Sequence, residues 1–538
     1  MNEDLDNSES KSIHKKLIEI LSLIPQKIKT ISTESWLLLV VAPLILTILS
    51  ISHVLLVMNT WGVYGFSFDD SWIHVQYART IFEGHPWEYA EGYPSTGSSG
   101  PLWSVVLVPI FLFGYEHNTV VTSVLIISSI LYFFDVVLVG KIVQERADNW
   151  VIGIVGQVAF ILVPRNAGLM LSGMETPLGM LMILLAIWML PKQGWRYDLT
   201  LGVVAGLAYL CRPEFVLIAA LCFPIRFILA LKDREIDRYR MASIIGMFAL
   251  AALVVLPWIL HCFNTTGLPL PDSYYSKMRW GVSEEAVELW NHFWWKVWFP
   301  YEPYLITGFI GGVVLLFKKR PFLLAITTSL FALYRFTMPG MSLLFAARYL
   351  VPLFDLLAIS AVCGIGILVK RIMELKEDTF KFSQLDVNVV SVLFILMIFY
   401  PSMGQYVFMV DHHANQTKNI EEMQVTLSLW IRENVPERSV IATYDVGAIG
   451  YFAEGTVIDL YGLVSPEILH NRTSLSNVTD YLKEMNCTYI MFYKQWFTAF
   501  HYNILAQGGS ITILAEAHLD DNVVCGTDDM AVYGIEWN

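Results

Sequence analysis

Residues 36–58 decide the fold and have the sequence Trp36-Leu-Leu-Leu-Val-Val-Ala-Pro-Leu-Ile-Leu-Thr-Ile-Leu-Ser-Ile-Ser-His-Val-Leu-Leu-Val-Met58. The stretch contains no Asp, Glu, Lys or Arg. A run of about 20 apolar residues is long enough to cross the hydrocarbon core of a bilayer as a helix. The stretch therefore predicts a transmembrane helix, and further apolar runs follow it along the chain.

The composition of the whole chain also indicates a membrane protein. Of the 538 residues, 55% are hydrophobic and only 15% are charged, whereas about 25% of the residues in a soluble domain carry a charge. The mean hydropathy is +0.53. Barrel strands would be about 10 residues long and alternate in polarity, so the longer apolar runs favour helices. We therefore expect a polytopic α-helical membrane protein.

We predict about eleven transmembrane helices between residues 34 and 410. Lys and Arg gather in the N-terminal segment 1–33 and in alternate loops after it, which satisfies the positive-inside rule. This pattern predicts a cytoplasmic N-terminus and an outer location for the tail. The expected spans are 34–58, 118–140, 150–164, 175–190, 198–211, 214–231, 241–262, 303–317, 321–337, 346–369 and 388–410.

Two long segments are expected on the outer side. The first outer loop, 59–117, contains the apolar run Pro101–Gly114, which is too short to span a bilayer and is interpreted as an interfacial or re-entrant helix. The tail, 411–538, has six Lys and Arg against seventeen Asp and Glu, so nucleic acid is not an expected partner. We predict a soluble α/β domain there, with a helix over Glu421–Asn434 and strands over Ser439–Tyr444, Thr456–Leu460, Tyr489–Tyr493 and Ile511–Ala515.

Ionisable residues gather where the predicted helices meet the outer side. Asp69 and Asp70 follow the first predicted span, and ionisable groups at membrane spans usually face a polar cavity. Each residue alone is equally consistent with an interfacial anchor or a structural ion pair. As a set they predict a polar cavity for an anionic ligand. The set is Asp69, Asp70, Arg79, Glu175, Arg212, Glu214, Lys277, Arg279 and Arg348.

A metal site is one of two interpretations of the first motif. Asp70 and His74 are four residues apart, so they share one face if the region is helical. That spacing is compatible with a divalent metal ion held by both side chains. It is equally compatible with a helix that begins at Asp69 as its N-cap. Both interpretations stay open, and no other cofactor is expected.

A series of short motifs follows in a fixed order along the chain. The first outer loop contributes Phe68-Asp-Asp-Ser-Trp-Ile73, Tyr77-Ala-Arg-Thr-Ile-Phe-Glu-Gly-His85, Glu91-Gly-Tyr-Pro94 and Ser99-Gly-Pro-Leu-Trp103. The later motifs are Ser172-Gly-Met-Glu-Thr-Pro177, Arg212-Pro-Glu214, Thr266-Gly-Leu-Pro269 with Lys277, Arg348-Tyr-Leu-Val-Pro352 and, in the tail, Asp445-Val-Gly-Ala-Ile-Gly-Tyr451. This ordered set resembles the GT-C-fold glycosyltransferases that depend on polyprenyl phosphates, and the nearest branch contains bacterial arabinofuranosyltransferases. Gln76 departs from the family pattern, which has arginine before Tyr-Ala.

The resemblance implies a membrane enzyme of cell-envelope glycan synthesis. It would move a monosaccharide from a polyprenyl-phosphate donor to a hydroxyl of a glycan, lipid or protein acceptor on the outer membrane face. A phosphate leaving group needs no proton donor, so one carboxylate base is sufficient. The base is expected to be Asp69 or Asp70, with Asp69 preferred because Asp70 is in register with His74. The expected substrate-binding residues are His74, Arg79, Glu175, Arg212, Glu214, Lys277 and Arg348, of which Lys277, Arg348 and Arg212 would stabilise the phosphate.

A transporter or flippase for a lipid-linked or anionic substrate is the alternative. Such proteins usually have internal repeats and helices broken at the bilayer midplane. The sequence shows neither feature, and its ionisable residues are expected on one side of the membrane. We therefore favour the enzyme.

Overall fold

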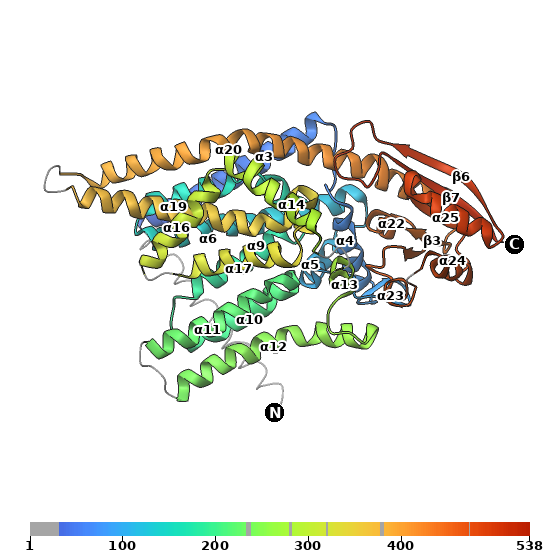
Figure 1. Ribbon diagram of the computed structural model, residues 1–538, viewed down its shortest axis with the longest axis horizontal. Coiled ribbons are helices and arrows are strands. Elements are labelled where there is room, and N and C mark those ends of the chain that lie inside the picture. Colours follow the sequence, from blue (N-terminus) through green and yellow to red (C-terminus); the bar gives the residue numbers. More distant parts are fainter. Residues whose placement is uncertain are drawn as a thin grey trace, which may run out of the picture.

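The computed structural model describes residues 32–232, 238–278, 282–318, 321–376, 381–472 and 474–537. Residues 1–31 of the predicted N-terminal segment and Arg279 lie outside the described residues. The molecule is elongated. Most of its long helices run along the longest axis, and the tail packs against one end of them (Figure 1).

Every one of the eleven predicted spans overlaps a helix. The helix of span 34–58 contains a short π-helical turn, Leu37–Val41, between α2 and α3. The helix of span 303–317 begins at a sharp bend. The helices are α2 (Thr33–Trp36), α3 (Ala42–Thr60), α6 (His117–Ala147), α7 (Trp150–Ile161), α8 (Asn166–Met170), α9 (Thr176–Met189), α10 (Trp195–Cys211), α11 (Val216–Lys232), α12 (Arg238–Thr266), α14 (Glu284–His292), α15 (Phe299–Tyr301), α16 (Tyr304–Phe317), α17 (Phe322–Thr337), α19 (Val351–Glu374) and α20 (Gln384–Ile420).

The number of membrane crossings stays a prediction. Among the described residues, six helical stretches are long and apolar enough to cross a membrane. A seventh would arise from Glu284–Tyr301 and Tyr304–Phe317, which meet at 89°. The remaining expected spans fall on shorter helices. The six stretches are Thr33–Thr60, His117–Ala147, Pro213–Leu231, Arg238–Thr266, Met341–Glu374 and Gln384–Asn434.

Helix α19 is the centre of the helical part. Its most apolar window is entirely buried, and its closest neighbour is α16. The two backbones meet at glycines, since a Cβ atom on Gly364 would lie 2.4 Å from the Cα atom of Gly311. Small residues let helices approach this closely, and packing then replaces the hydrophobic effect as the source of cohesion inside a bilayer.

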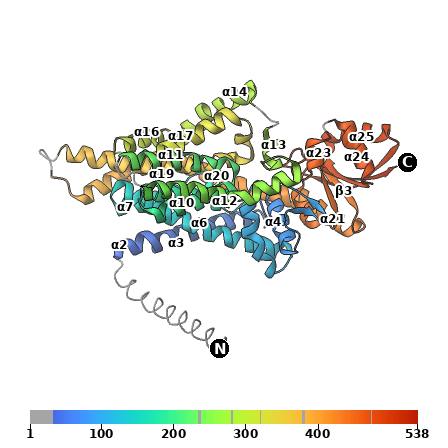
Figure 2. The same ribbon diagram turned by 90° about the horizontal axis from the view of Figure 1, so that it is seen from below.

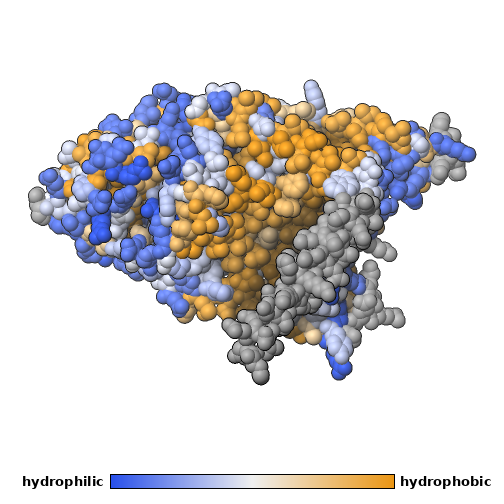
Figure 3. Space-filling model, turned by 180° about the vertical axis from the view of Figure 1, so that it is seen from behind, coloured by the Kyte–Doolittle hydropathy of each residue, from blue (hydrophilic) through white to orange (hydrophobic). Residues whose placement is uncertain are grey.

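The surrounding helices expose apolar side chains. Leu56 on α3, Phe248 on α12 and Met397 on α20 are each 62% exposed. Figure 3 shows such side chains gathered over the helical part, with hydrophilic side chains toward both ends of the molecule. An apolar belt of this kind is what a bilayer covers.

The first outer loop is folded and joins the two parts of the molecule. Its main element is α4 (Asp69–Phe82), followed by the hairpin of β1 (Glu88–Ala90) and β2 (Tyr93–Pro94). The predicted short helix over Pro101–Gly114 is present as α5 (Pro101–Leu107) and a 3-10 turn over Val108–Leu112. Both pack against α4, so this apolar run supports the loop.

The tail is an α/β domain with a five-stranded mixed sheet in the order β4-β3-β5-β7-β6. The predicted helix 421–434 and the four predicted strands are present, and the sequence analysis missed β7 in the middle of the sheet. Strands β3, β4 and β5 are parallel, whereas β7 is antiparallel to both neighbours. The elements are α21 (Thr426–Asn434), β3 (Val440–Thr443), α22 (Gly447–Phe452), β4 (Thr456–Asp459), α23 (Pro466–His470), α24 (Leu475–Glu484), β5 (Tyr489–Tyr493), α25 (Lys494–Ala506), β6 (Gly509–His518) and β7 (Asp529–Trp537).

Helix α20 connects the helical part to the tail without a break. It runs from Gln384 to Ile420 and continues through a π-helical turn, Glu421–Val425, into α21. At the same end of the molecule, α4 and α13 (Asp272–Met278) lie next to the tail (Figure 2). The segments with α4 and α13 and the tail therefore lie together at the end of the molecule where the predicted site is.

Candidate functional site

A cavity of about 370 Å³ lies between the helical part and the tail. Four regions far apart in sequence form its wall: the start of α4, the end of α13, the segment 341–349 before α19, and the tail. The lining residues include Asp69, Asp70, Lys277, Met341, Leu344, Phe345, Arg348, Tyr349, Gln424, Asp445, Tyr461, Leu463 and Tyr493.

Asp69 connects the first outer loop to the tail. Its carboxylate accepts hydrogen bonds from the backbone amides of Gly447 at 2.6 Å and Ala448 at 2.8 Å, at the start of α22. Both carboxylate oxygens are thus engaged. Burial and the nearby carboxylate of Asp445 raise the pKa of Asp69 well above its usual range. Asp69 is therefore a docking group that binds a proton readily.

Asp445 is the tail's own carboxylate in the cavity. It accepts hydrogen bonds from the Tyr493 hydroxyl and from the side-chain amide of Gln424, the latter at 2.9 Å. Burial raises its pKa above the usual range. Asp69 and Asp445 thus form an acidic pair to which the two parts of the molecule contribute one carboxyl each.

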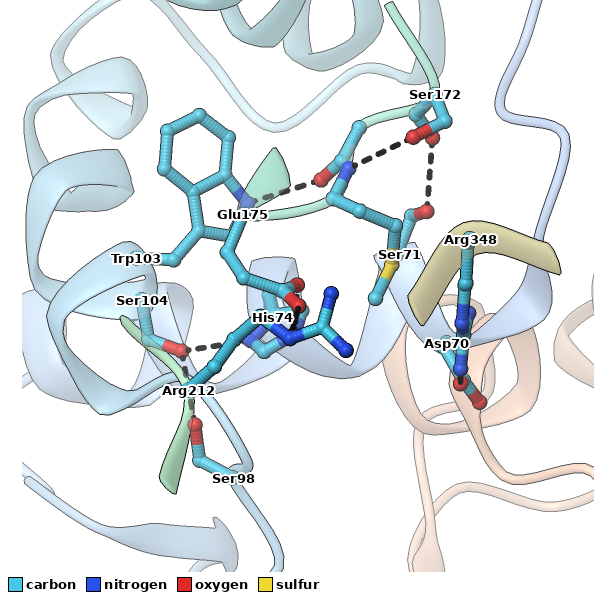
Figure 4. Close-up of polar contacts among 12 residues, drawn as sticks. Asp70, Ser71, His74, Ser98, Trp103, Ser104, Ser172, Glu175, Arg212 and Arg348 are labelled. Carbon is cyan, nitrogen blue, oxygen red and sulfur yellow. Dashed lines mark hydrogen bonds and ion pairs between the residues drawn. The ribbon is translucent and has the colours of Figure 1, made fainter. Parts of the chain in front are cut away.

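Asp70 has a different environment, although it is the next residue. Its carboxylate accepts a hydrogen bond from Arg348, which lies in the 3-10 turn just before α19 (Figure 4). Its side chain remains 36% exposed, whereas that of Arg348 is 5% exposed. Burial opposes ionisation, but the charge of Arg348, the hydrogen bond to it and the charge of Lys277 lower the pKa of Asp70 below its usual range. Asp70 is therefore an ionised, accessible carboxylate.

The ring of Tyr349 organises three cations. The guanidinium carbons of Arg212 and Arg348 lie 4.6 Å and 5.2 Å from its centre, and the Lys277 ammonium lies at 5.3 Å. Cation–π attraction offsets part of the repulsion among these charges. Lys277 forms no ion pair with any described residue, and Nη1 of Arg348 has no hydrogen-bond partner among them. Lys277 and Arg348 thus both line the cavity and both retain hydrogen-bonding capacity.

The backbone before Arg348 is strained. Phe345, Ala346 and Ala347 are three consecutive non-glycine residues with positive φ angles of 53°, 58° and 57°. Left-handed conformations cost roughly 1–2 kcal/mol per residue, and such strain is retained mainly at functional positions. The turn places the Phe345 ring 4.7 Å from the Arg348 guanidinium and orients Arg348 toward Asp70.

A second polar cluster lies behind the cavity wall (Figure 4). His74 contacts Glu175 at 3.5 Å and the Ser104 hydroxyl at 3.3 Å. Arg212 contacts the same Glu175 at 3.7 Å and Glu214 at 2.5 Å. The side chains of this cluster are buried or nearly buried. Among its charged residues, only Arg212 contacts the ring of Tyr349. The cluster holds Arg212 against the Tyr349 ring, and neither Arg212 nor any other member lines the cavity.

The structure separates Asp70 from His74, which the metal interpretation had paired. Asp70 turns to Arg348, and His74 turns to Glu175 and Ser104. Among the described residues, no group of three or more His, Cys, Asp or Glu side chains is arranged to hold a metal ion. The predicted helix is present as α4, but Asp69 is its first residue and not its N-cap. Phe68 holds the N-cap position, and the Asp69 carboxylate binds the amides of Gly447 and Ala448 instead.

Arg79 also lies away from the cavity, contrary to its predicted role in substrate binding. It donates to Glu83 at 3.0 Å and to the carbonyl of Tyr451 at 3.1 Å. With Gln76 it borders a separate pocket against the tail. Gln76 itself donates to the carbonyl of Tyr89. Gln76, which stands where the family pattern has arginine, therefore binds the β1–β2 hairpin and lies outside the cavity.

Several cavity residues were missed from the sequence. Tyr349 stands within the quoted motif Arg348–Pro352, and Asp445 opens the quoted tail motif, but neither was assigned a role. Tyr349 directly follows the charged Arg348, and Asp445 stands two residues before Gly447 in a glycine-rich motif. Gln424 and Tyr493 carry no local signal, because only the folded tail brings them to Asp445.

Comparison with solved structures identifies the fold. The apo oligosaccharyltransferase of Archaeoglobus fulgidus aligns with a TM-score of 0.57 at 12% identity, covering 86% of this chain and 70% of that one. ArnT from Cupriavidus metallidurans bound to undecaprenyl phosphate aligns with a TM-score of 0.56 at 12% identity, covering 90% and 97%. The chain has the GT-C fold. It is an integral membrane protein.

The other comparisons add less. AglB from Archaeoglobus fulgidus, in complex with an inhibitory peptide and a dolichol-phosphate, aligns with a TM-score of 0.53 at 13% identity over 86% of this GT-C chain and 70% of that one. Residues 418–533 match the family described as Domain of unknown function (DUF8728). No curated protein matches the sequence. The nearer resemblance to arabinofuranosyltransferases stays a prediction.

Proposed function

We propose that this GT-C chain is a glycosyltransferase that moves a monosaccharide from a polyprenyl phosphate to an acceptor hydroxyl in the 370 Å³ cavity. The observation that carries the proposal is the placement of Asp70 beside Arg348 and Lys277 in one cavity. That combination offers a carboxylate to a hydroxyl and cations to a phosphate. The lipid phosphates in the ArnT and AglB structures support a donor of the same class.

The cations would hold the phosphate of the donor. Arg348 uses Nη2 for Asp70, and its Nη1 has no partner among the described residues but is covered by protein. A small movement of the guanidinium toward the cavity would let it bridge the carboxylate and a phosphate oxygen. Lys277 lies on the neighbouring side of the Tyr349 ring. Apolar side chains of Met341, Leu344 and Phe345 line the adjacent wall and would contact the first prenyl units.

Asp70, not Asp69, is our candidate for the base. The carboxylate of Asp69 is committed to the amides of Gly447 and Ala448. Asp70 is ionised, more than one third exposed, and next to the phosphate-binding cations. The preference for Asp69 that rested on spacing to His74 is therefore revised, because His74 has other partners.

The reaction balances with these groups alone. The Asp70 carboxylate accepts the proton of the acceptor hydroxyl while the oxygen of that hydroxyl forms a bond to the anomeric carbon of the donor sugar. The bond between that carbon and the phosphate oxygen breaks, and its electron pair leaves with the polyprenyl phosphate. Lys277 and Arg348 stabilise the charge that grows on the phosphate. Asp70 then loses its proton to water.

The transporter alternative has weaker support. The bend between α15 and α16 is the kind of broken helix that transporters use. Both carboxylate oxygens of Glu302 at the bend have partners. One forms a buried ion pair with Arg165 at 2.8 Å, and the other accepts a hydrogen bond from the Tyr304 hydroxyl. The cavity takes none of its lining from this bend.

The orientation is part of the proposal. We infer from the charge pattern that the cavity and tail face the outer side, with the N-terminus in the cytoplasm. A cysteine at Asp480, exposed on α24, should react with an impermeant reagent in intact cells. A cysteine at Asp148, exposed at the end of α6, should react only after permeabilisation. The parent chain provides the background of native thiols, and the reverse result would overturn the orientation.

The enzymatic test uses the purified full chain and a panel of polyprenyl-phosphate sugars, with product detection by mass spectrometry. Asp70→Asn keeps the side-chain shape, so it should abolish transfer while donor binding persists. Asp69→Asn should retain partial activity, and Asp480→Asn on the exposed face of α24 should match wild type. Near-normal turnover of Asp70→Asn would remove the proposed base.

A further inference from the structure

A second cleft, of about 600 Å³, lies on the other side of the tail loop that walls the cavity. Three regions form it: the β1–β2 hairpin, the end of α12, and the edge of the tail at β4 and α24. The lining residues are Pro86, Glu88, Tyr89, Tyr93, His261, Asn264, Thr265, Thr456, Val464, Ser465, Glu467 and Tyr481, with adjoining residues of the hairpin and β4. None of these residues has a role in the reaction proposed above.

The wall between cleft and cavity is thin. Leu463 lines the cavity, and the next residue, Val464, lines the cleft. The loop is held by buried Asp459, whose carboxylate accepts from the amides of Tyr461 at 2.8 Å and Val464 at 2.9 Å. A single loop thus separates the cavity from the cleft.

The cleft differs from the cavity in charge. The described lining contains no Lys or Arg, and its charged members are Glu88 and Glu467. The cavity, in contrast, presents Lys277 and Arg348. A phosphate or another anion would find no Lys or Arg in the lining, because the nearby Arg472 is outside it and is paired with Glu467 at 3.1 Å. A neutral ligand rich in hydroxyl groups fits the lining better.

The lining also has the side chains that bind sugar rings. Tyr93 projects from the hairpin with 44% of its surface exposed, and Tyr481 lies across the cleft on α24. Aromatic rings cover the apolar face of a sugar while polar groups bond its hydroxyls. Asn264 and Thr265 form no side-chain hydrogen bond that involves another described residue, so these groups remain available at the end of α12.

The floor of the cleft is rigid. The Tyr89 hydroxyl donates to the carbonyl of Val446 at 2.7 Å, and His261 contacts the carbonyl of Ser95 at 3.1 Å. Trp87 has a left-handed φ of 66° and packs against Trp258 with ring centres 4.8 Å apart. A preformed site loses less entropy on binding than a mobile one, and strained positions such as Trp87 tend to lie at binding sites.

We propose that the cleft binds neutral sugar residues of the acceptor, so that the acceptor of this enzyme is an oligosaccharide and not a single sugar. The acceptor hydroxyl lies in the cavity and the remote sugars lie across Tyr93 and Asn264. The identification of the bound sugars as the acceptor rests on the proposed glycosyltransferase function. The binding of neutral sugars by the cleft does not depend on catalysis.

The first experiment measures binding without transfer. The purified full chain is titrated with neutral glucan, mannan, galactan and arabinan oligosaccharides, from disaccharide to hexasaccharide. At least one series should bind more tightly as the chain lengthens, and Tyr93→Ala and Asn264→Ala should each weaken the longer members at least tenfold. Tyr502→Ala is the matched control, because Tyr502 is a 67% exposed tyrosine of the tail outside both linings. Absence of binding, or equal binding by Tyr93→Ala, would overturn the proposal.

The second experiment separates this inference from the proposed function. With a donor that supports transfer, Tyr93→Ala should raise the KM of a long acceptor at least tenfold with a much smaller effect on kcat, whereas the control Tyr502→Ala should leave both constants unchanged. Asp70→Asn should lose transfer but still bind the oligosaccharide. Oligosaccharide binding with no transfer from any donor would reject the enzyme and keep the cleft. Transfer with a KM that is indifferent to Tyr93 would reject the cleft and keep the enzyme.

Discussion

The backbone amide of Gly447 donates to the carboxylate of Asp69 at 2.6 Å, across 378 residues of sequence. This contact joins the first turn of α4 to the first turn of α22. An anionic or polar oxygen at a helix N-terminus satisfies amides that have no partner within the helix. The same contact seals one edge of the cavity, so the tail is part of the site and not an appendage.

Gly447→Ala should undock the tail. A Cβ atom there would lie 1.9 Å from the Asp69 carbonyl oxygen, a distance that no side-chain rotation can relieve. We expect a lower unfolding temperature, faster proteolysis within the tail and loss of most transfer activity. Gly404→Ala is the control, since nothing lies within 4 Å of that position on α20. Equal stability of the two variants would show that Asp69 and Gly447 do not hold the interface.

Removing either cation of the cavity should slow transfer. Lys277→Ala and Arg348→Ala each delete a charge-assisted contact to the leaving phosphate, and losses of roughly a hundredfold in kcat are typical for such groups. Arg348→Lys should recover little, because a single ammonium cannot bridge Asp70 and a phosphate as a guanidinium does. Arg432→Ala on the exposed face of α21 is the control. A double variant with wild-type turnover would place the phosphate elsewhere.

How much of this site follows from sequence depends on the range of the contacts. Asp69, Asp70, Lys277 and Arg348 were chosen because charge beside a predicted span is costly, and the fold brings all four to one cavity. His74 and Arg79 were chosen by the same rule, yet helix α4 turns them to other neighbours. Position on a helix fixes a face, but only tertiary structure decides what that face meets.

The fold shows the same division. The apolar runs located the helices, because length and polarity are local properties. Strand β7 was missed although it lies between β5 and β6, since its sequence, Asp529–Trp537, mixes Gly, Glu and aromatic residues without strict alternation. The docking of Asp69 on Gly447 depends on pairs hundreds of residues apart, and a single sequence contains no signal for it.

The acidic pair of Asp69 and Asp445 should make stability depend on pH. Burial and mutual repulsion raise the pKa of Asp69 in the folded state, whereas its unfolded value is about 4. Between these two pKa values the folded protein binds more protons than the unfolded chain. The contribution of protonated Asp69 to the free energy of unfolding is therefore complete below about pH 4 and is lost as the pH rises toward the folded pKa. The wild type should lose stability relative to Asp69→Asn as the pH increases through neutrality, as measured by unfolding temperature. Asp480→Asn should follow the wild type, and parallel curves for wild type and Asp69→Asn would contradict the assignment.

The last prediction concerns the strained turn before Arg348. Ala346 has a φ of 58°, which glycine adopts freely and which a β-branched residue strongly resists. Ala346→Gly should therefore keep near-normal transfer, because relief of strain offsets the greater flexibility of the unfolded chain. Ala346→Val should move Arg348 away from Asp70 and lower kcat about tenfold or more, which corresponds to about 1.4 kcal/mol of transition-state stabilisation. Ala325→Val adds the same two methyl groups within helix α17 and controls for bulk. If Ala346→Val and Ala325→Val have equal activity, the left-handed turn does not position Arg348, and the geometry of the phosphate site has another origin.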